Sequence, residues 1–340
     1  MPLDEQVDRP LATIVMTTYN QEKYVRDSVR GLLSQTYEPL EIIVSDDCSQ
    51  DRTWEIINEE VRVYKESGGK HTRIALNRNE RNLGIARHND KVLSMCHGVL
   101  RVDNGGDDIS APNRVERIFE EWDRTGRMAT NIYSGAWLID YEGRRVGQLG
   151  RYYFTDGCLG AVAAYSMRIR DEFKPIAVVG GAEDTIYANR ARLLGTNKLY
   201  INENLLFYRV GTGVSTIGAN WRKPNLATFR ANVKSAEQAL LDLESVRVRL
   251  DLPKYAKFKD EFEATIAENQ LHAALLSSSS FRERWNAYRR IHYRPWFRPG
   301  GIYQLLCLLP PRCGDPMLNL LSRLNKMINQ KMGSRMFERV

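Results

Sequence analysis

Short runs of apolar and β-branched residues alternate with helix-like stretches through the first 122 residues of the chain. In each helix-like stretch the apolar residues recur every three or four positions, which is the period of an amphipathic helix. The strands are expected at residues 12–17, 41–45, 72–76 and 99–102, and the helices at residues 22–34, 54–63, 85–95 and 111–122. This order predicts an α/β fold of Rossmann-like type, with a mostly parallel sheet and flanking helices on both faces.

A different pattern begins near residue 131. Strands around a turn are expected at residues 131–140 and 146–153, and a further strand pair at residues 198–209. After Ser215 the strand signals stop, and long helical patterns follow at residues 226–243, 257–277 and 317–332. We therefore predict an α/β domain over residues 1–217 and a helical C-terminal region with a basic amphipathic tail over residues 218–340.

The cysteine content and the apolar runs narrow the class of protein. The five cysteines are an odd number and include no C-x-x-C pair, which argues against a disulfide framework or a structural zinc site and favours a reducing compartment. Residues 1–10 have no apolar signal core, and the strongest apolar run, residues 302–309, is far shorter than the roughly 20 residues of a membrane-spanning helix. We expect a cytoplasmic protein.

The positive charge of the chain is concentrated at its C-terminal end. Residues 281–340 contain 12 basic and 3 acidic residues, a net charge of +9, which leaves −2 for residues 1–280. Basic residues interleaved with aromatic and leucine side chains suit an anionic membrane surface, here the inner face of the plasma membrane. A helical cap that packs on the α/β domain explains the same pattern about as well. Basic residues alone do not specify nucleic acid, and we expect no nucleic-acid partner.

Carboxylates follow two of the predicted strands. Asp46 and Asp47 come after the second strand, and Asp107 and Asp108 come after the fourth. In an open α/β sheet these strand ends form one edge, where ligands bind. Two carboxylate pairs are costly to bring together without a cation, and they suit Mg²⁺ or Mn²⁺ bridging a diphosphate. The alternative is that each pair caps the helix that follows it.

Five motifs occur in a fixed order along the first 115 residues. They are T-T-Y-N at 17–20, Q-T-Y at 35–37, E-I-I-V-S-D-D-C-S-Q-D at 41–51, N-L-G-I-A-R at 82–87 and G-D-D-I-S-A-P-N-R at 106–114. In this order they resemble the family 2 glycosyltransferases of the GT-A fold, of the bacterial surface-polysaccharide type. G-A-E-D-T at 181–185 and L-L-F-Y-R-V-G-T-G-V-S at 205–215 extend the resemblance. It implies that residues 1–217 are a GT-A catalytic domain.

The resemblance also implies roles for individual residues. The nucleotide-binding residues are then Thr17, Tyr19, Asp47, Arg87 and Asp107, with Asp47 accepting a hydrogen bond from the base. Asp108, together with Asp107, would hold Mn²⁺ or Mg²⁺. Asp184 of the E-D motif would be the general base, with Glu183 as the next candidate and helix capping as the alternative role.

The sequence departs from the family pattern at two positions. Gly105 stands where the metal motif has its leading Asp, and Gly211 stands where the closing loop often has a histidine. Any contact of that loop with the metal or the phosphates would therefore come from Arg209, Thr212 or backbone amides.

The implied function is inverting transfer of a sugar from a UDP- or dTDP-sugar to a hydroxyl of a glycan or lipid-linked glycan acceptor. One alternative is a nucleotidyltransferase of related sheet architecture, but T-T-Y-N-Q-E lacks the glycine-rich, arginine-containing phosphate loop that such an enzyme needs. A second is a non-catalytic carbohydrate-binding module, against which the intact Asp107, Asp108 and Asp184 argue. A dinucleotide dehydrogenase is excluded, because no G-x-G-x-x-G follows a strand.

Overall fold

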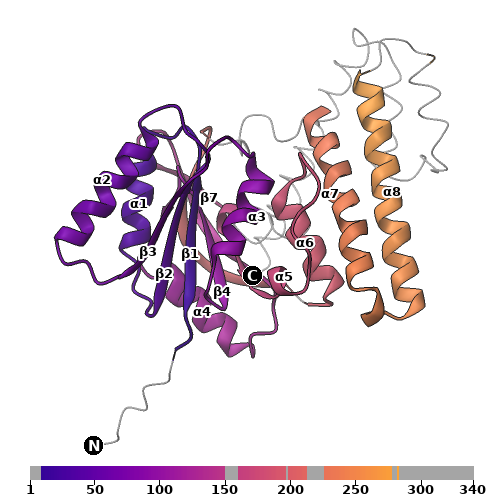
Figure 1. Ribbon diagram of the computed structural model, residues 1–340, viewed down its shortest axis with the longest axis horizontal. Coiled ribbons are helices and arrows are strands. Elements are labelled where there is room, and N and C mark those ends of the chain that lie inside the picture. The colour runs from indigo at the N-terminus through magenta and orange to yellow at the C-terminus, as the bar shows by residue number, and fades with distance from the viewer. Residues whose placement is uncertain (1–8, 150–159, 197, 213–225, 278–281, 283–340) are drawn as a thin grey trace, which may run out of the picture. The chain divides into compact units, whose positions relative to one another are not determined.

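Figure 1 shows the computed structural model of the chain. The structure describes residues 9–149, 160–196, 198–212, 226–277 and 282. The chain divides into two compact units, one of residues 1–219 with 234–259 and one of residues 220–233 with 260–340. The helix predicted at residues 317–332, and the basic tail apart from Arg282, lie outside the described residues.

The larger unit contains a mixed sheet with the strand order β3-β2-β1-β4-β8-β6-β9-β5, and β7 pairs with β6. The strands are β1 (Ala12–Thr18), β2 (Leu40–Asp46), β3 (Arg73–Arg78), β4 (Leu100–Gly105), β5 (Ile109–Ser110), β6 (Asn131–Ile139), β7 (Arg145–Leu149), β8 (Ala163–Ser166) and β9 (Lys198–Arg209). The helices are α1 (Val25–Leu33), α2 (Thr53–Glu66), α3 (Ile85–Met95), α4 (Arg114–Arg124), α5 (Arg168–Asp171), α6 (Glu183–Leu193), α7 (Leu226–Ser245) and α8 (Leu252–Ser277).

The first half of the sheet confirms the predicted α/β architecture. Strands β3, β2, β1 and β4 are all parallel, and each is followed along the chain by a helix or by the short strand β5 and then α4. Thr18 at the end of β1 lies opposite Asp46, and Thr17 lies opposite Gly105 of β4. The carboxyl ends of the three central strands therefore meet at one edge.

The second half of the sheet is mixed. β8 runs antiparallel to β4 and β6, whereas β9 runs parallel to β6 and antiparallel to β5. Residues 198–209 form one twelve-residue strand, so the predicted strand pair is wrong. The register of β6 against β9 shifts on both sides of Gly135, and a β-carbon at Gly135 would lie 3.0 Å from the carbonyl oxygen of Glu203. A glycine lets the long strand continue past this irregularity.

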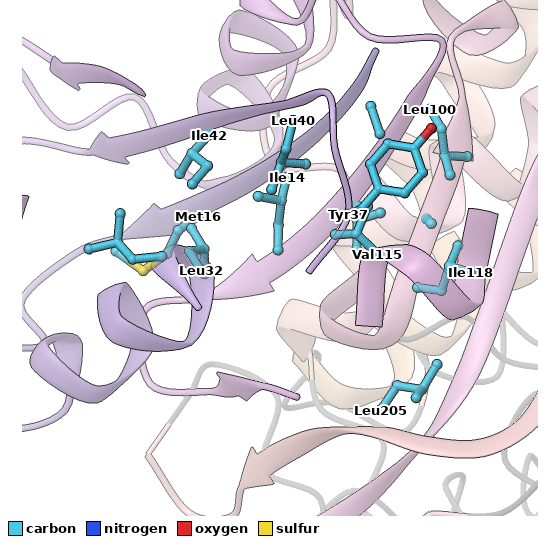
Figure 2. Close-up of a cluster of buried hydrophobic side chains, with 14 of the residues drawn as sticks. Ile14, Met16, Leu32, Tyr37, Leu40, Ile42, Leu100, Val115, Ile118 and Leu205 are labelled. Atoms are coloured by element: carbon cyan, nitrogen blue, oxygen red, sulfur yellow. The ribbon is translucent and has the colours of Figure 1, made fainter. Parts of the chain in front are cut away.

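Alternating side chains of the central strands belong to two apolar layers, one on each face of the sheet. Ile14 and Met16 of β1 belong to the layer shared with α1, α2 and α4, and Val15 belongs to the layer shared with α3 and α6. Figure 2 shows part of the first layer, in which Tyr37 lies among leucine, isoleucine and valine side chains. Each fully buried apolar side chain of this kind stabilises the fold by about 1.5–3 kcal/mol, so these layers hold the strand ends in a fixed position.

The C-terminal helices α7 and α8 are 20 and 26 residues long. Within the described residues, no helix combines the length and the apolar character that crossing a bilayer requires. Residues 234–245 of α7 belong to the larger unit, together with the sheet.

Candidate active site

The loops after β1, β2 and β4 are joined to one another by backbone hydrogen bonds that continue past the strand ends. The amide of Asp47 donates to the carbonyl of Thr18 at 2.9 Å, and the amide of Gly106 donates to the carbonyl of Thr17 at 3.2 Å. The polar segments that the sequence places after these strands are therefore neighbours in space.

Gly106 allows the loop after β4 to lie directly against the loop after β1. A β-carbon at this position would collide with the side chains of Thr18 and Gln21. The hydroxyl of Thr18 donates to Gln21 Oε1 at 2.7 Å, and the hydroxyl of Ser28 donates to the carbonyl of Gly106 at 2.9 Å. A glycine is needed here for close approach of the two loops.

The carboxylates of Asp107 and Asp108 converge on the space above Gly105. A β-carbon on Gly105 would lie 3.0 Å from Asp107 Oδ1 and 2.8 Å from Asp108 Oδ2. Both side chains are buried. Burial, together with the charge of Asp107, raises the pKa of Asp108 well above its ordinary value. Two buried carboxylates this close favour the approach of a positive charge.

These residues fit a divalent cation. Carboxylate oxygens that face one space are the ligands that Mg²⁺ prefers, and this ion usually takes its other ligands from phosphates and water. A cation held by Asp107 and Asp108 would offset the repulsion that raises the pKa of Asp108. Neither here nor elsewhere in the described ranges is a group of three or more His, Cys, Asp or Glu side chains placed to hold a metal ion, so Asp107 and Asp108 would be a two-carboxylate site.

The end of β9 contacts both carboxylates. The amide of Arg209 donates to Asp108 Oδ1 at 2.9 Å, and the hydroxyl of Thr212 donates to Asp107 Oδ2 at 2.7 Å. The guanidinium of Arg209 donates to the carbonyl oxygens of Asp107, at 3.1 Å, and of Asp140, at 2.8 Å. Arg209 and Thr212, the candidates of the closing loop, therefore hold the acidic pair in place.

Asp47 anchors the turn that leads into α3. Its Oδ1 accepts hydrogen bonds from Asn79 Nδ2 at 2.7 Å and from the amide of Leu83 at 2.9 Å, and its Oδ2 accepts one from the amide of Gly84 at 3.0 Å. A carboxylate offers about four acceptor positions. Asp47 can therefore accept one further hydrogen bond, such as one from a nucleobase.

The hydrogen bonds of Asp46 and the first residues of helices α2 and α4 show whether the Asp pairs cap the helices that follow them. Asp46 accepts hydrogen bonds from the amide of Ser49 at 2.9 Å and from its hydroxyl, and its Oδ2 lies 3.4 Å from Arg78 Nε. Helix α2 begins after Arg52 and helix α4 begins after Asn113, in both cases without a side-chain cap. The Asp pairs after β2 and β4 therefore do not cap the helices that follow them.

The other nucleotide candidates lie at the same edge of the sheet. Thr17 is partly buried near the end of β1, and the side chain of Tyr19 is 44% exposed. Arg87 is exposed in the first turn of α3, three residues after Gly84, whose amide Asp47 holds. Asp47 therefore fixes the start of the helix that carries Arg87.

Glu183 and Asp184 form the first turn of α6, and Ala182 precedes them without a side-chain cap. Asp184 Oδ1 accepts a hydrogen bond from the amide of Thr185 at 2.6 Å. Burial raises the pKa of Asp184, and burial together with the charge of Asp184 raises the pKa of Glu183 to about 8. Glu183 Oε1 lies 3.3 Å from the position of a β-carbon at Gly160.

Arg114 forms hydrogen bonds with residues near each acidic pair in the sequence or in space. Its Nη1 donates to Ser110 Oγ at 3.0 Å, close to Asp108, and its Nη2 donates to the carbonyl of Ala161 at 2.8 Å, next to Gly160. Arg114 is fully buried, and burial lowers its pKa to about 10. Its Nε has no hydrogen-bond partner among the described residues. The sequence motif that ends at Arg114 implies no role for this residue, although R-V-E-R-I at the start of a helix places an arginine on its buried face.

Arg101 of β4 is a second fully buried arginine, and the sequence motifs imply no role for it. Its Nε lies 2.5 Å from Asp103 Oδ1. Its Nη1 donates to the carbonyl of Asn89 at 3.1 Å. The signal in the sequence is L-R-V-D, in which opposite charges alternate with apolar residues, so that both charges face the same side of the strand.

Residues 13–159 match the family model described as Glycosyl transferase family 2. Residues 13–159 are thus similar to the family 2 glycosyltransferases. An uncharacterized glycosyltransferase of Methanocaldococcus jannaschii is 33% identical over 41% of this chain and 46% of its own length. Glycosyltransferase GlyG of Streptococcus pneumoniae is 21% identical over 77% of this chain and 90% of its own length. For three of the curated relatives, the match spans only 37% to 61% of the relative's length.

The solved structure of S. aureus TarS residues 1–349 in complex with UDP-GlcNAc superposes with a TM-score of 0.52. The likeness covers 88% of this chain and 79% of that one, at 15% sequence identity. At this identity the likeness shows the fold alone, and it confirms the predicted GT-A fold class.

Proposed function

We propose that the protein is an inverting glycosyltransferase that transfers a sugar from a UDP- or dTDP-sugar to a hydroxyl of a glycan or lipid-linked glycan, in the assembly of surface polysaccharide. The observation that carries this proposal is the convergence of the Asp107 and Asp108 carboxylates above Gly105, beside the loop that contains Thr17 and Tyr19. A nucleoside diphosphate needs both elements: a surface for the nucleoside and an anchor for the diphosphate.

The donor side of the proposed site uses residues from three loops. Thr17 and the exposed ring of Tyr19 would flank the nucleoside, and Asp47 would accept a hydrogen bond from the base with its remaining acceptor position. Arg87 would contact the diphosphate from the first turn of α3. Asp108 and Asp107 would hold Mn²⁺ or Mg²⁺, which when bound supplies positive charge to the leaving diphosphate.

Asp184 would act as the general base. It would accept the proton of the acceptor hydroxyl while that oxygen forms a bond to the anomeric carbon and the bond to the diphosphate oxygen breaks. Because attack and departure occur on opposite faces of the sugar, the configuration inverts. The raised pKa of Asp184 brings its basicity closer to neutral pH, which suits proton transfer there.

The net charge of +9 over residues 281–340 supports a peripheral position on the cytoplasmic face of an anionic membrane. Deletion of residues 314–340 should then release the protein from anionic vesicles in a flotation assay. The full chain should not bind neutral vesicles, and it should dissociate from anionic vesicles as the salt concentration rises. Failure of the full chain to bind anionic vesicles would leave the tail as a packed cap.

The test of the proposed activity is a screen of UDP- and dTDP-sugars for hydrolysis, with and without Mn²⁺. We expect hydrolysis of at least one donor in the presence of Mn²⁺ and a large loss of it with EDTA. Absence of hydrolysis for every donor, together with absence of UDP or dTDP binding by calorimetry, would overturn the proposal.

A further inference from the structure

The segment before the E-D motif has no regular secondary structure. Residues 172–182 connect α5 to α6 without a strand or helix, so their backbone amides have no partners in a ladder. Buried backbone amides are nearly always hydrogen-bonded, because an unpaired one costs the free energy of a lost hydrogen bond. The hydrogen-bond partners of this segment therefore help to fix the positions of Glu183 and Asp184, which directly follow it.

Two side chains of helix α7, which lie 53 to 61 residues further along the chain, accept hydrogen bonds from three of these amides. Gln238 Oε1 accepts hydrogen bonds from the amides of Ala177 at 2.9 Å and Val178 at 3.3 Å. Ser235 Oγ accepts a hydrogen bond from the amide of Ala182, the residue before Glu183, at 2.9 Å. Ser235 is fully buried and Gln238 is 2% exposed, so water does not compete for these bonds.

A third residue on the same helix holds α6 itself. Asp242 Oδ2 accepts a hydrogen bond from Arg190 Nε at 2.8 Å, and both side chains are buried. Gln238 Nε2 donates to Asp242 Oδ1 at 3.0 Å, which links the contacts to each other. Ser235, Gln238 and Asp242 are spaced three and four residues apart, so they lie on one face of α7.

Gly181 lies close to both α7 and the first turn of α6. A β-carbon at Gly181 would lie 3.4 Å from Ser235 Oγ and 3.5 Å from the amide nitrogen of Ser235, which are ordinary contact distances, and 3.1 Å from Ile186 Cδ1, which is tight. The backbone before the E-D motif is therefore packed against Ser235 itself, and a β-carbon at Gly181 would press only on Ile186.

We propose that Ser235, Gln238 and Asp242 are positioning residues that fix the first turn of α6 and thereby aim the carboxylate of Asp184 at the acceptor hydroxyl. This inference rests on the proposed function only in the role of Asp184; the contacts that fix the turn are independent of it. Helix α7 lies beyond the stretch that matches the family model, residues 13–159. The catalytic geometry thus depends on a part of the chain that the donor-binding motifs do not include.

The test compares two serine-to-alanine variants of α7. Ser235→Ala removes the acceptor for the Ala182 amide. Ser245→Ala is the matched control, because among the described residues the hydroxyl of Ser245 donates to the carbonyl of Asp242 within its own helix, at 2.6 Å, and forms no hydrogen bond with residues 172–182. Gln238→Met is the second variant, which keeps the size of the side chain but cannot accept from Ala177, and it carries the test if Ser235→Ala does not fold.

Hydrogen–deuterium exchange of the full-length protein without ligand gives the first measurement. In Ser235→Ala we expect the amides of residues 182–186 to exchange about tenfold faster, the factor expected for loss of one buried hydrogen bond. Exchange over residues 11–105, and UDP binding with Mn²⁺ by calorimetry, should be unchanged. Exchange in residues 182–186 that matches that of Ser245→Ala, or a uniform increase along the chain, would overturn the proposal.

Turnover gives the second measurement, with the donor sugar that the parent protein hydrolyses. Ser235→Ala should lower kcat about tenfold and leave KM for the donor within about twofold, because the donor loops are not touched. A change in KM alone would contradict a role in aiming the base. If the parent protein hydrolyses no donor, the proposed function fails, and the exchange measurement still decides whether α7 fixes the turn.

Discussion

The two sides of the candidate site are built in different ways. On the donor side, Asp47, Asp107 and Asp108 follow parallel strands directly, and the register of those strands brings them together. On the base side, Asp184 follows an irregular segment whose amides are held by a helix that begins more than 40 residues later. In the proposed function, donor binding would therefore depend on neighbouring strands, whereas placement of the base would depend on long-range contacts.

This difference predicts that substitutions on the two sides change different measured quantities. Damage on the donor side should appear in nucleotide binding and its dependence on metal. Damage on the base side should appear in turnover, with nucleotide binding preserved.

The largest effect is expected for Asp108→Ala on the donor side. The variant should lose transfer by about a thousandfold or more, because the leaving diphosphate would lose its cation. In calorimetry, Mn²⁺ should strengthen UDP or dTDP binding in the parent protein and have no effect in the variant. Asp123→Ala removes an exposed carboxylate that pairs with Arg127 and should behave like the parent. Equal nucleotide affinity with and without Mn²⁺ in the parent would remove the basis for a metal at this site.

Asp184→Asn tests the base side. The amide keeps the size of the side chain but cannot take a proton, so we expect turnover to fall about a hundredfold with nucleotide affinity nearly unchanged. In the parent, turnover should rise with pH through a pKa above 3.8, because Asp184 must be ionised to accept the proton and burial raises its pKa. This rise should be absent from the residual activity of the variant. Near-normal turnover would move the base to Glu183.

The donor side could be predicted from the sequence because it is local. Each strand is a short β-branched run, and its polar residues follow within a few positions, so the order of the motifs was enough to place Asp47 and Asp108 at one edge. The sequence could not show that the two carboxylates occupy the space where a side chain of residue 105 would lie, because that depends on how the loop folds back.

The base side was only partly predictable. The E-D motif and its helix were found, but β8, with the sequence A-A-Y-S, is too short and too poor in β-branched residues to stand out. A strand pair was predicted over residues 198–209, whereas the structure accommodates the polar residues Asn202 to Asn204 within one strand. Ser235 gave no signal in the sequence, because its importance comes from a backbone amide far away in the sequence. The helical pattern placed Arg114 on a buried face, but it could not show the hydrogen bond to the carbonyl of Ala161.

Gly105→Asp tests whether the space that Asp107 and Asp108 occupy can hold a third carboxylate. It introduces the Asp that leads the metal motif of the family. One might expect a third carboxylate to strengthen metal binding. The β-carbon would instead lie 2.8 Å from Asp108 Oδ2, whose partner oxygen is held by the amide of Arg209. We therefore expect the strengthening of UDP binding by Mn²⁺ to fall about tenfold. Gly143→Asp, at an exposed turn with a positive φ, is the control for a general effect of added charge. Stronger metal-dependent binding in Gly105→Asp would show that the carboxylates can move apart.

The smallest expected effect is on stability, and it concerns Glu183. Its pKa is raised to about 8, so between the ordinary value of 4.5 and about 8 the folded protein holds a proton that the unfolded chain has released. Stability contributed by this proton is fully present below pH 4.5 and is lost as pH rises through 8. Glu183→Gln cannot lose the proton, so its melting temperature should match that of the parent at pH 5 and exceed it by about 3 °C or more at pH 9. Glu55→Gln, at an exposed position of α2, should show no such divergence between the two pH values. A constant difference across this range would mean that Glu183 is ionised in the folded protein, and the base side would then carry two negative charges at neutral pH.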